Sequence, residues 1–340
     1  MRIGIDLGGT KIEAIVVAAN GAQLLRRRID TPSGNYHATL EAVSSLVRSV
    51  EGEIGCHTTI GFGIPGAISL LTGRVKNANS TCLIGREILQ DLAQALSRPV
   101  RVMNDANCFV LSETSDGAAS PEAAPDVQVV FGLILGTGVG GGIVFRGKAL
   151  SGRNAIAGEW GHCPLPWPRP EERPGPPCYC GKSGCIETFL SGPALLQDYH
   201  AHGGNAGTTR EMVSRAAEDQ DDLAEAALQR YEDRLARALA MVINILDPDA
   251  IVLGGGISNI GRLYESLPRR LPEYVFSDSF DTLILPPKHG DSSGVRGAAW
   301  LWSREEAERL EKTWSNGGLP LRANAARPRS NETALKQRDR

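Results

Sequence analysis

The sequence contains no apolar run approaching the roughly 20 residues that a membrane-spanning helix needs. Its N-terminus, MRIGIDLGGTKIE, has no basic segment followed by an apolar stretch, so it does not resemble a secretory signal. Its charges are nearly balanced, with 36 basic and 39 acidic residues and a formal net charge of −3. The sequence therefore predicts a cytoplasmic protein and gives no electrostatic reason to expect nucleic acid or an anionic membrane as its partner.

One common nucleotide-binding motif is missing and another is incomplete. No G-x-x-x-x-G-K-[ST] occurs in the chain, which excludes a Walker A loop. Gly136, Gly138 and Gly141 match the dinucleotide pattern G-x-G-x-x-G, and Glu159 lies near the distance expected for a ribose-binding carboxylate. However, residues 143–148 are typical of a strand and a turn, whereas a dinucleotide-binding fold requires a helix there. A dehydrogenase is therefore only the minor alternative.

Apolar runs and helical periodicity predict an α/β protein, and 340 residues are enough for two domains. A stretch of small residues at 117–126 indicates a domain boundary, and 164–177 is too rich in proline to be regular. The polar stretch 315–340 is predicted to be disordered. No sequence repeat is evident, although a duplicated fold would not need one. Strands are predicted at 2–7, 12–18, 23–29, 59–64, 100–103, 127–135, 143–145 and 250–253, and helices at 36–50, 228–246 and 295–302.

Three glycine-rich loops follow predicted strands, where backbone N–H groups can approach phosphate oxygens closely. In the first loop Asp6 can hold Mg²⁺, and the alternative is a glycine-rich hairpin turn with a solvated carboxylate. The third loop can accept a flat adenine or ribose, or can simply be a tight turn from strand to helix. The candidate nucleotide-binding residues are Asp6, Gly8, Gly9, Thr10, Lys11, Gly136, Thr137, Gly138, Gly140, Gly254, Gly255 and Gly256.

Asn104 and Asp105 follow a buried strand, at the end where α/β folds place ligand sites. Asp105 could accept the proton of a substrate hydroxyl as that oxygen attacks a phosphorus atom. Alternatively, Asp105 only caps the next helix and Asn104 is only a turn residue. The loops at 77–81 and 158–162 carry side chains suited to sugar hydroxyls, although such loops more often lie on the surface.

Three of the seven cysteines, Cys178, Cys180 and Cys185, lie within eight residues. In a reducing compartment such a cluster indicates a metal site rather than a disulfide framework. His162 can supply the fourth ligand, and four N and S ligands fill a tetrahedral Zn²⁺ shell of the structural kind. Free thiols or an iron–sulfur site with an added ligand are the alternatives.

In order along residues 1–302, the motifs IGIDLGGTK, GFGIPG, NDAN, LGTGVGGG, GEWGH, CYCGKSGCIE and IVLGGG resemble the ROK family of repressors, open reading frames and sugar kinases. This resemblance implies an actin-like, ribonuclease-H-type fold with two α/β domains and a cleft between them. Residues 1–118 would form the small domain, with a helix near 291–304 packing back on it. Residues 119–290 would form the large domain with the zinc loop. The family also implies a homodimer.

The resemblance assigns roles to individual residues. It implies that residues 6–11 and 136–142 bind the phosphates of ATP, that 254–256 lie near the nucleotide, and that Asp105 is the catalytic base. The zinc ligands it implies are His162, Cys178, Cys180 and Cys185. The sugar contacts it implies are Asn79, Asn104, Asp105, Glu159, His162 and Glu187.

VKNANST, GEWGHCPLPW and KHGDSSGVRGAAWLW look most like the fructokinase and mannokinase branch. The sequence therefore predicts ATP- and Mg²⁺-dependent phosphorylation of a hexose, D-fructose first, at its 6-hydroxyl. Glucokinase and N-acetylhexosamine kinase are the alternatives within the family, and Cys82, where many relatives carry Trp, alters the expected sugar pocket. A repressor would need a DNA-binding segment before Asp6, for which we expect no room. A non-enzymatic sugar sensor is the remote alternative.

Overall fold

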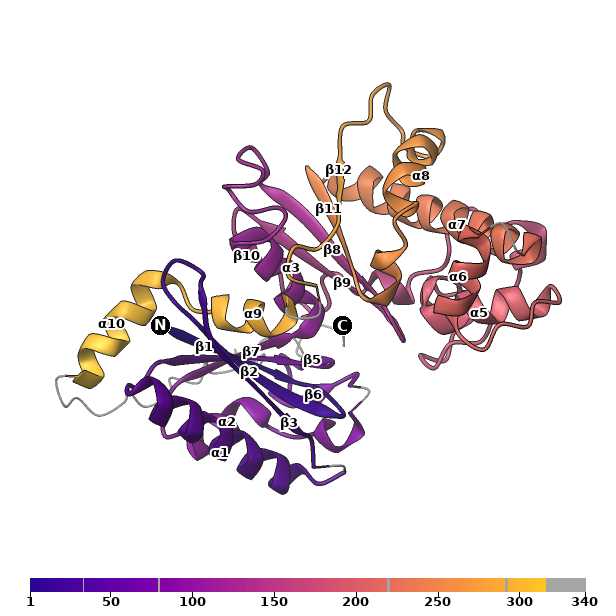
Figure 1. Cartoon of the computed structure of the whole chain (residues 1–340). Coiled ribbons are helices and arrows are strands. Elements are labelled where there is room, and N and C mark those ends of the chain that lie inside the picture. The colour runs from indigo at the N-terminus through magenta and orange to yellow at the C-terminus, as the bar shows by residue number, and fades with distance from the viewer. Residues whose placement is uncertain (33, 79, 219–220, 291–292, 316–340) are drawn as a thin grey trace, which may run out of the picture.

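The computed structural model describes residues 1–32, 34–78, 80–218, 221–290 and 293–315. Its larger strands form two separate five-stranded sheets, one within residues 2–104 and the other within residues 129–285 (Figure 1). The predictions for Asn79 and for nearly all of the C-terminal tail fall on residues that the structure does not describe.

The first sheet is formed by the N-terminal third of the chain. In order across the sheet its strands are β3 (Gln23–Asp30), β2 (Lys11–Val17), β1 (Arg2–Leu7), β4 (Thr59–Ile64) and β7 (Val100–Asn104). Helices α1 (Tyr36–Ile54) and α2 (Ile88–Ala95) cover its outer face (Figure 1). β1 and β4 are apolar and buried on both faces because helices lie on both sides of them. A short hairpin, β5 (Ala67–Ile68) and β6 (Val75–Lys76), follows β4.

The second sheet repeats this arrangement. In order its strands are β10 (Lys148–Ala149), β9 (Val139–Phe145), β8 (Val129–Leu135), β11 (Ala250–Gly254) and β12 (Leu283–Leu285). In both sheets three consecutive antiparallel strands are continued by two parallel strands. The duplicated topology confirms the predicted actin-like α/β fold, although the two halves share no evident sequence repeat.

Helices α3 (Asp105–Ser115) and α9 (Ser293–Trp300) lie between the two sheets (Figure 1). α3 packs mainly on β8 and β9, whereas α9 packs on β1 and β4. The helices touch each other closely, since a Cβ atom at Gly297 would lie 1.6 Å from the carbonyl oxygen of Cys108. Glycine at this position therefore sets the separation of the two helices, and with it the spacing of the two sheets.

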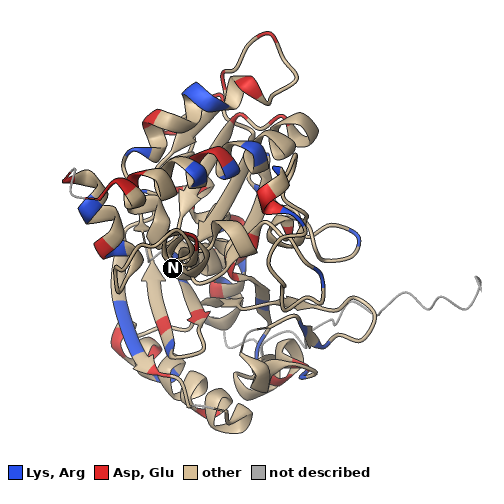
Figure 2. Cartoon of the chain, turned by 90° about the vertical axis from the view of Figure 1, so that its right-hand side faces the viewer, with Lys and Arg blue, Asp and Glu red and all other residues tan. Residues whose placement is uncertain are grey.

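Further helices pack beyond the second sheet, with the largest apolar core between them and the sheet. They are α4 (Glu187–Leu190), α5 (Gly192–Ala201), α6 (Thr209–Ala217), α7 (Asp222–Leu246) and α8 (Leu263–Arg270). α7 ends at the left-handed residue Asp247, just before Pro248. Residues of both charge signs are intermixed along these helices (Figure 2). None of the helices in the described ranges has both the length and the apolar character needed to cross a membrane.

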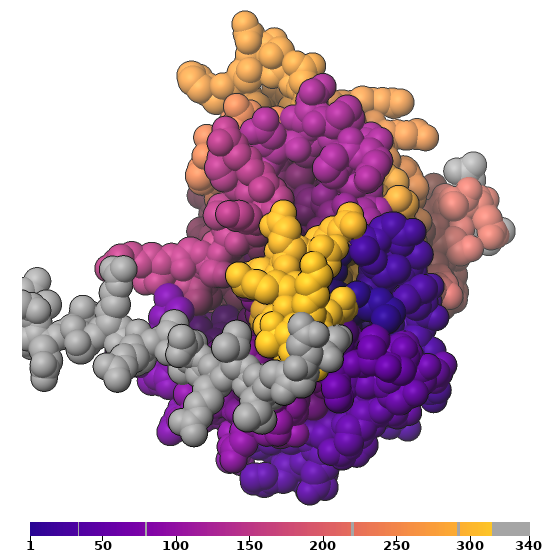
Figure 3. All heavy atoms as spheres, turned by 90° about the vertical axis from the view of Figure 1, so that its left-hand side faces the viewer, coloured from indigo at the N-terminus to yellow at the C-terminus, as the bar shows by residue number. Residues whose placement is uncertain are grey.

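The structure contains several short elements that the sequence analysis did not predict, among them α2, α5, α6, α8 and β12, and it differs further in two places. β9 begins at Val139, so residues 140–142 of the predicted glycine loop belong to a strand. The pairing of β9 with β8 and its close packing on α3 explain why glycines are tolerated there. Helix α10 (Arg304–Ser315) was not predicted, and Figure 3 shows it beside the N-terminal residues. It is tied there by an ion pair of 2.6 Å between the Met1 ammonium and Glu311.

Candidate active site between the two sheets

Asp6 and Asp105 lie at the carboxyl ends of β1 and β7, facing the region between the two sheets. The position that a Cβ atom of Gly63 would take lies 3.5 Å from both Asp6 Oδ1 and Cys108 Sγ. The carboxyl end of β1 therefore lies against the first turn of α3, of which Asp105 is the first residue. The predicted magnesium-binding carboxylate and the predicted base are neighbours.

Both carboxylates are partly exposed but largely surrounded by protein. Burial is the main cause that raises the pKa of Asp6 to about 7, and the charges of Asp105 and Glu13 add to it. Burial likewise raises the pKa of Asp105 to about 6, with the charge of Glu159 adding to it. A carboxylate with a pKa near neutrality is suited to proton transfer at physiological pH.

Asn104 is the cap of helix α3. Its Oδ1 accepts hydrogen bonds from the backbone N–H groups of Ala106 (2.9 Å) and Asn107 (3.3 Å), and its Nδ2 donates to the carbonyl oxygen of Gly66 (2.9 Å). Asn104 is therefore the N-cap of α3. Asp105 Oδ1 also accepts a hydrogen bond from the N–H of Ala106 (2.8 Å), so the Asp105 carboxylate takes part in the first turn as well.

The first glycine loop is the tight turn between β1 and β2. The backbone N–H of Gly8 donates to the carbonyl oxygen of Lys11 (3.0 Å), and Thr31 Oγ1 donates to the carbonyl oxygen of Gly8 (2.8 Å). Thr31 also donates its N–H to the carbonyl oxygen of Thr10 (2.9 Å). Gly9, Thr10 and Lys11 are exposed, so the tip of the turn is accessible.

Ser80 lies beside this turn, since a Cβ atom at Gly9 would be 3.0 Å from Ser80 Oγ. Within the described ranges, that buried hydroxyl oxygen has no hydrogen-bond partner. Ser80 was not predicted as a site residue. Its place in the polar NANST stretch was the only signal, and Asn79 of that stretch is not described.

The second glycine loop is the turn between β8 and β9. Gly136 donates its N–H to the carbonyl oxygen of Gly138 (3.0 Å) and accepts from the N–H of Gly192 (2.8 Å). A Cβ atom at Gly140 would lie 3.3 Å from the Cβ of Ala106, so the hairpin packs against the first turn of α3, beside Asp105. Thr137 at the tip is exposed.

The third glycine loop ends β11. Gly255 has a φ of 80°, and a Cβ atom there would lie 2.4 Å from the carbonyl oxygen of Leu135. A Cβ atom at Gly254 would lie 2.5 Å from the ring of Phe109. Both glycines are thus required by packing whether or not a nucleotide binds. Gly256 has open space around it and is the member of the triplet that a ligand can approach.

Glu159 and Glu187 approach the site from the part of the chain that follows β10. Glu187 Oε2 accepts a hydrogen bond from the N–H of Val139 (2.9 Å), immediately after the second glycine turn. Glu159 lies close enough to Asp105 for its charge to affect that residue's pKa. The next residue, Trp160, is buried and donates to the carbonyl oxygen of Gly140 (3.3 Å).

The four predicted zinc ligands come together. The donor atoms of His162, Cys178, Cys180 and Cys185 all lie within 4.8 Å of one another. Cys180 Sγ and Cys185 Sγ are 3.6 Å apart, and Cys178 Sγ lies 3.5 Å from His162 Nδ1. Tetrahedral Zn²⁺ with ordinary bond lengths requires about 3.8 Å between two sulfurs and about 3.6 Å between sulfur and nitrogen. The geometry and the soft donors therefore fit zinc.

His162 uses its two ring nitrogens in different directions. Nδ1 faces Cys178, while Nε2 lies 2.9 Å from the hydroxyl oxygen of Tyr179. With Nδ1 committed to the metal cluster, only Nε2 is left for a sugar hydroxyl. Tyr179 is therefore a neighbour of the predicted sugar contact that the sequence did not single out.

The chain also resembles known proteins along most of its length. The sequence profile of the ROK family matches residues 2–305. An N-acetyl-D-glucosamine kinase from Vibrio parahaemolyticus is 38% identical over 88% of this chain and 99% of its own length. Another, from Escherichia coli O1:K1, is 40% identical over 88% of this chain and 99% of its own length.

Solved structures agree with this comparison. A ROK hexokinase from Thermus thermophilus matches with a TM-score of 0.75 and 30% identity, covering 88% of this chain and 96% of the hexokinase. A ROK glucokinase from Streptomyces griseus, in complex with glucose and AMPPNP, matches with a TM-score of 0.71 and 26% identity. The match covers 88% of this chain and 98% of the glucokinase. The ordered motifs, the duplicated fold and these matches establish that the chain belongs to the ROK family.

Proposed function

We propose that this protein is an ATP-dependent sugar kinase that phosphorylates the 6-hydroxyl of N-acetyl-D-glucosamine. The choice of sugar rests on relatives named N-acetyl-D-glucosamine kinases, which are 38–40% identical and covered over 99% of their length. The sequence prediction of D-fructose finds no such support, and its N-acetylhexosamine alternative fits better. Glucose is the second candidate, because similar solved structures are named as a hexokinase and a glucokinase.

The observation that carries the kinase proposal is the convergence of Asp105 with two glycine turns at the interface of the sheets. Asp105 accepts the proton of the sugar hydroxyl as that oxygen attacks the γ-phosphorus. Its raised pKa, about 6, lets it hold that proton during the transfer while it is still ionised beforehand at neutral pH.

The two glycine turns supply backbone N–H groups to the phosphates of ATP. The exposed tips of these turns, at Gly9 to Lys11 and at Thr137, allow the phosphates to approach without meeting large side chains. Asp6 would hold Mg²⁺, which neutralises phosphate charge when it is bound. A bound cation would also favour ionised Asp6 and Asp105, which otherwise repel each other.

Zn²⁺ at His162 and the three cysteines would fix the loop that carries Glu159 and Glu187 toward the sugar side. We propose domains at 1–118 and 119–290, and their closure would exclude water from the reaction. The homodimer and the cytoplasmic location stay predictions.

The test is to identify the product. The protein is incubated with MgATP and N-acetyl-D-glucosamine, and the sugar is analysed by mass spectrometry and ³¹P–¹H NMR. We expect one phosphate per sugar, coupled to the protons on carbon 6, formed in step with ADP. ADP without a phosphorylated sugar, or no ADP from zinc-loaded folded protein, would contradict the kinase assignment.

A further inference from the structure

The proline-rich segment 164–177 connects two of the predicted zinc ligands, His162 and Cys178. It begins after His162 and ends before Cys178, and both of its ends pair with the chain around Gly184. Leu165 donates its N–H to the carbonyl oxygen of Gly184 (2.9 Å), and Gly184 donates to the carbonyl oxygen of Pro176 (2.9 Å). The middle of the segment is held by contacts remote from the metal ligands.

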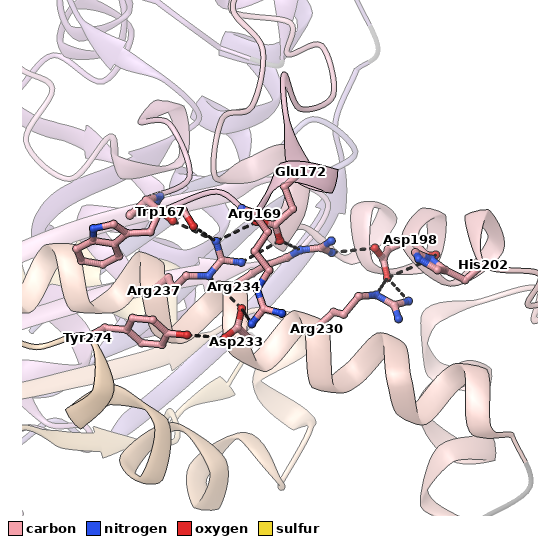
Figure 4. A network of polar contacts seen from close by, with 11 residues as sticks. Trp167, Arg169, Glu172, Asp198, His202, Arg230, Asp233, Arg234, Arg237 and Tyr274 are labelled. Carbon is pink, nitrogen blue, oxygen red and sulfur yellow. Dashed lines mark hydrogen bonds and ion pairs between the residues drawn. The ribbon is translucent and has the colours of Figure 1, made fainter.

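Glu172, in the middle of this segment, is held by two arginines of α7. Its carboxylate accepts hydrogen bonds from Arg234 Nε (2.8 Å) and from Arg237 Nη1 (3.0 Å) and Nη2 (2.8 Å), as Figure 4 shows. The Glu172 side chain is only 4% exposed, and that of Arg237 only 2%. Burial alone would raise the pKa of Glu172, but the hydrogen bonds from Arg237 and Arg234 outweigh it and lower that pKa to about 2.

Arg237 also holds the backbone of the segment. Its Nη1 donates to the carbonyl oxygens of Pro166 (3.1 Å) and Trp167 (2.9 Å) (Figure 4). Its Nε donates to Asp233 Oδ2 (3.0 Å). One buried guanidinium therefore fixes two separate positions of the segment, its start at 166–167 and its middle at Glu172.

A stacking contact strengthens the same attachment. The ring of Trp167 stacks on the ring of Tyr274 with centroids 6.0 Å apart and an angle of 18° between the planes. The Tyr274 hydroxyl donates to Asp233 Oδ1 (2.6 Å), so the ring that supports Trp167 is tied to the same helix. The stack, like the ion pairs, contains no metal ligand.

A buried ion network is a weak source of stability, because desolvation of the charges offsets much of their attraction. Such a network instead fixes the relative positions of the groups that it joins, because each buried charge needs its hydrogen-bond partners. Here the network fixes the position of the segment that joins the predicted zinc ligands His162 and Cys178. His162 is also a proposed sugar contact.

We propose that Glu172 and Arg237 are positioning residues that clamp the zinc loop independently of the metal. The clamp holds the connection between His162 and Cys178 in its ligating conformation, which slows the loss of zinc and keeps His162 in place for the sugar. The part of this inference that concerns the sugar rests on the proposed function.

The test compares Glu172→Gln with Glu232→Gln in the zinc-loaded protein. Glu232 is an equally buried carboxylate of α7, 2% exposed, but its arginine partners Arg262 and Arg270 lie outside the segment. Zinc release is followed with a chromogenic chelator, and KM and kcat are measured with N-acetyl-D-glucosamine. We expect Glu172→Gln to release zinc about tenfold faster and to raise the sugar KM with little change in kcat. Glu232→Gln should match the wild type in both.

Equal zinc release rates in the two variants, or a wild-type protein that retains no zinc, would overturn the inference. If Glu172→Gln does not fold, Trp167→Ala removes the stacking contact at a side chain that is 55% exposed, and it should release zinc several-fold faster. An unchanged rate in that variant would count against the clamp. If no sugar is phosphorylated, the proposed function fails, while the zinc release rates still decide the inference.

Discussion

Asp6 and Asp105 place two carboxylates within reach of each other's charge, and neither has a neutralising arginine as its main partner. Such an arrangement is unfavourable for folding, and it is what a site for a cation and a transferable proton requires. The chemistry and the stability of the protein should therefore both depend on these two residues.

Replacing Asp105 by Asn removes the proton acceptor and keeps the shape of the side chain. We expect kcat to fall by about 10² or more, the usual contribution of a general base. The affinity for the sugar should change much less, and Asp126→Asn, at an exposed position, is the control. If Asp105→Asn keeps the turnover of the wild type, the assigned role is wrong.

The activity should depend on pH through the same pair. Because Asp105 has to be ionised to accept a proton, kcat/KM should rise with pH through an apparent pKa of about 6 to 7 that belongs to the two carboxylates together. The measurement is the pH profile of kcat/KM from pH 5 to 8.5. An acid limb near pH 4 would show that the carboxylates have ordinary pKa values.

Stability should change with pH in the opposite direction. A carboxylate whose pKa is raised by folding contributes most below its unfolded pKa, about 4, and this contribution is lost as pH rises through its folded pKa. For Asp6, with a folded pKa of about 7, the loss falls between about pH 4 and pH 7. Asp6→Asn should therefore have a higher Tm than the wild type, and this difference in Tm should increase from pH 4.5 to pH 8. A constant difference in Tm would contradict the raised pKa.

At the scale of elements, the close contact of α3 and α9 fixes the separation of the two sheets. Gly297→Ala would place a methyl group against the backbone of Cys108, and we expect a loss of about 2–3 kcal/mol in the free energy of unfolding. Gly294→Ala, in the same helix, meets no atom within 4 Å and should be neutral or slightly stabilising. Denaturant unfolding of both variants checks this, and equal values would show that the helices are not held by this contact.

Glu187, a predicted sugar contact, accepts a hydrogen bond from the N–H of Val139, which directly follows the second glycine turn. If it also contacts the sugar, binding of sugar should strengthen binding of a non-hydrolysable ATP analogue by about fivefold. The ratio of the analogue's affinities with and without sugar should therefore be about five in the wild type and about one in Glu187→Ala. Glu171→Ala, at an exposed position of the proline-rich segment, should keep the wild-type ratio. Calorimetric titration with and without sugar measures the ratio, and an unchanged ratio in Glu187→Ala would exclude the coupling.

Local sequence patterns predicted those elements that are marked by an apolar run or by helical spacing of apolar residues. Buried strands such as 59–64 and the ends of β1 and β7, where the predicted site residues lie, follow from apolar runs that stop at proline, glycine or asparagine. α10 was missed because its sequence, REEAERLEKTWS, is mostly charged and polar and offers few apolar residues, such as Ala307 and Leu310, for burial. The contact of Glu172 with Arg237 joins positions 65 residues apart, which no local pattern indicates.

At the scale of the whole molecule, the candidate site depends on the repetition of one topology in two sheets. Each sheet has a glycine turn between its first two strands, and α3, which begins at Asp105, packs against the β8–β9 hairpin and lies beside the carboxyl end of β1. A sequence comparison of the halves does not reveal this duplication, because topology depends on the apolar pattern of the strands rather than on residue identity.

The identity of the sugar is likewise a property of the assembled molecule. Hydroxyl-by-hydroxyl hydrogen bonding decides selectivity, and a single unpaired buried group changes it by orders of magnitude. The motifs that suggested fructose are short, whereas the proposal of N-acetyl-D-glucosamine rests on relatives that match 88% of this chain.

The most direct measurement is kcat/KM with MgATP for N-acetyl-D-glucosamine, glucose and fructose, using the zinc-loaded protein. We expect kcat/KM for N-acetyl-D-glucosamine to exceed that for each of the other two sugars by at least about tenfold. A higher kcat/KM for glucose or fructose would contradict the assigned substrate, and no turnover with any of the three would contradict the assignment of the site as that of a sugar kinase.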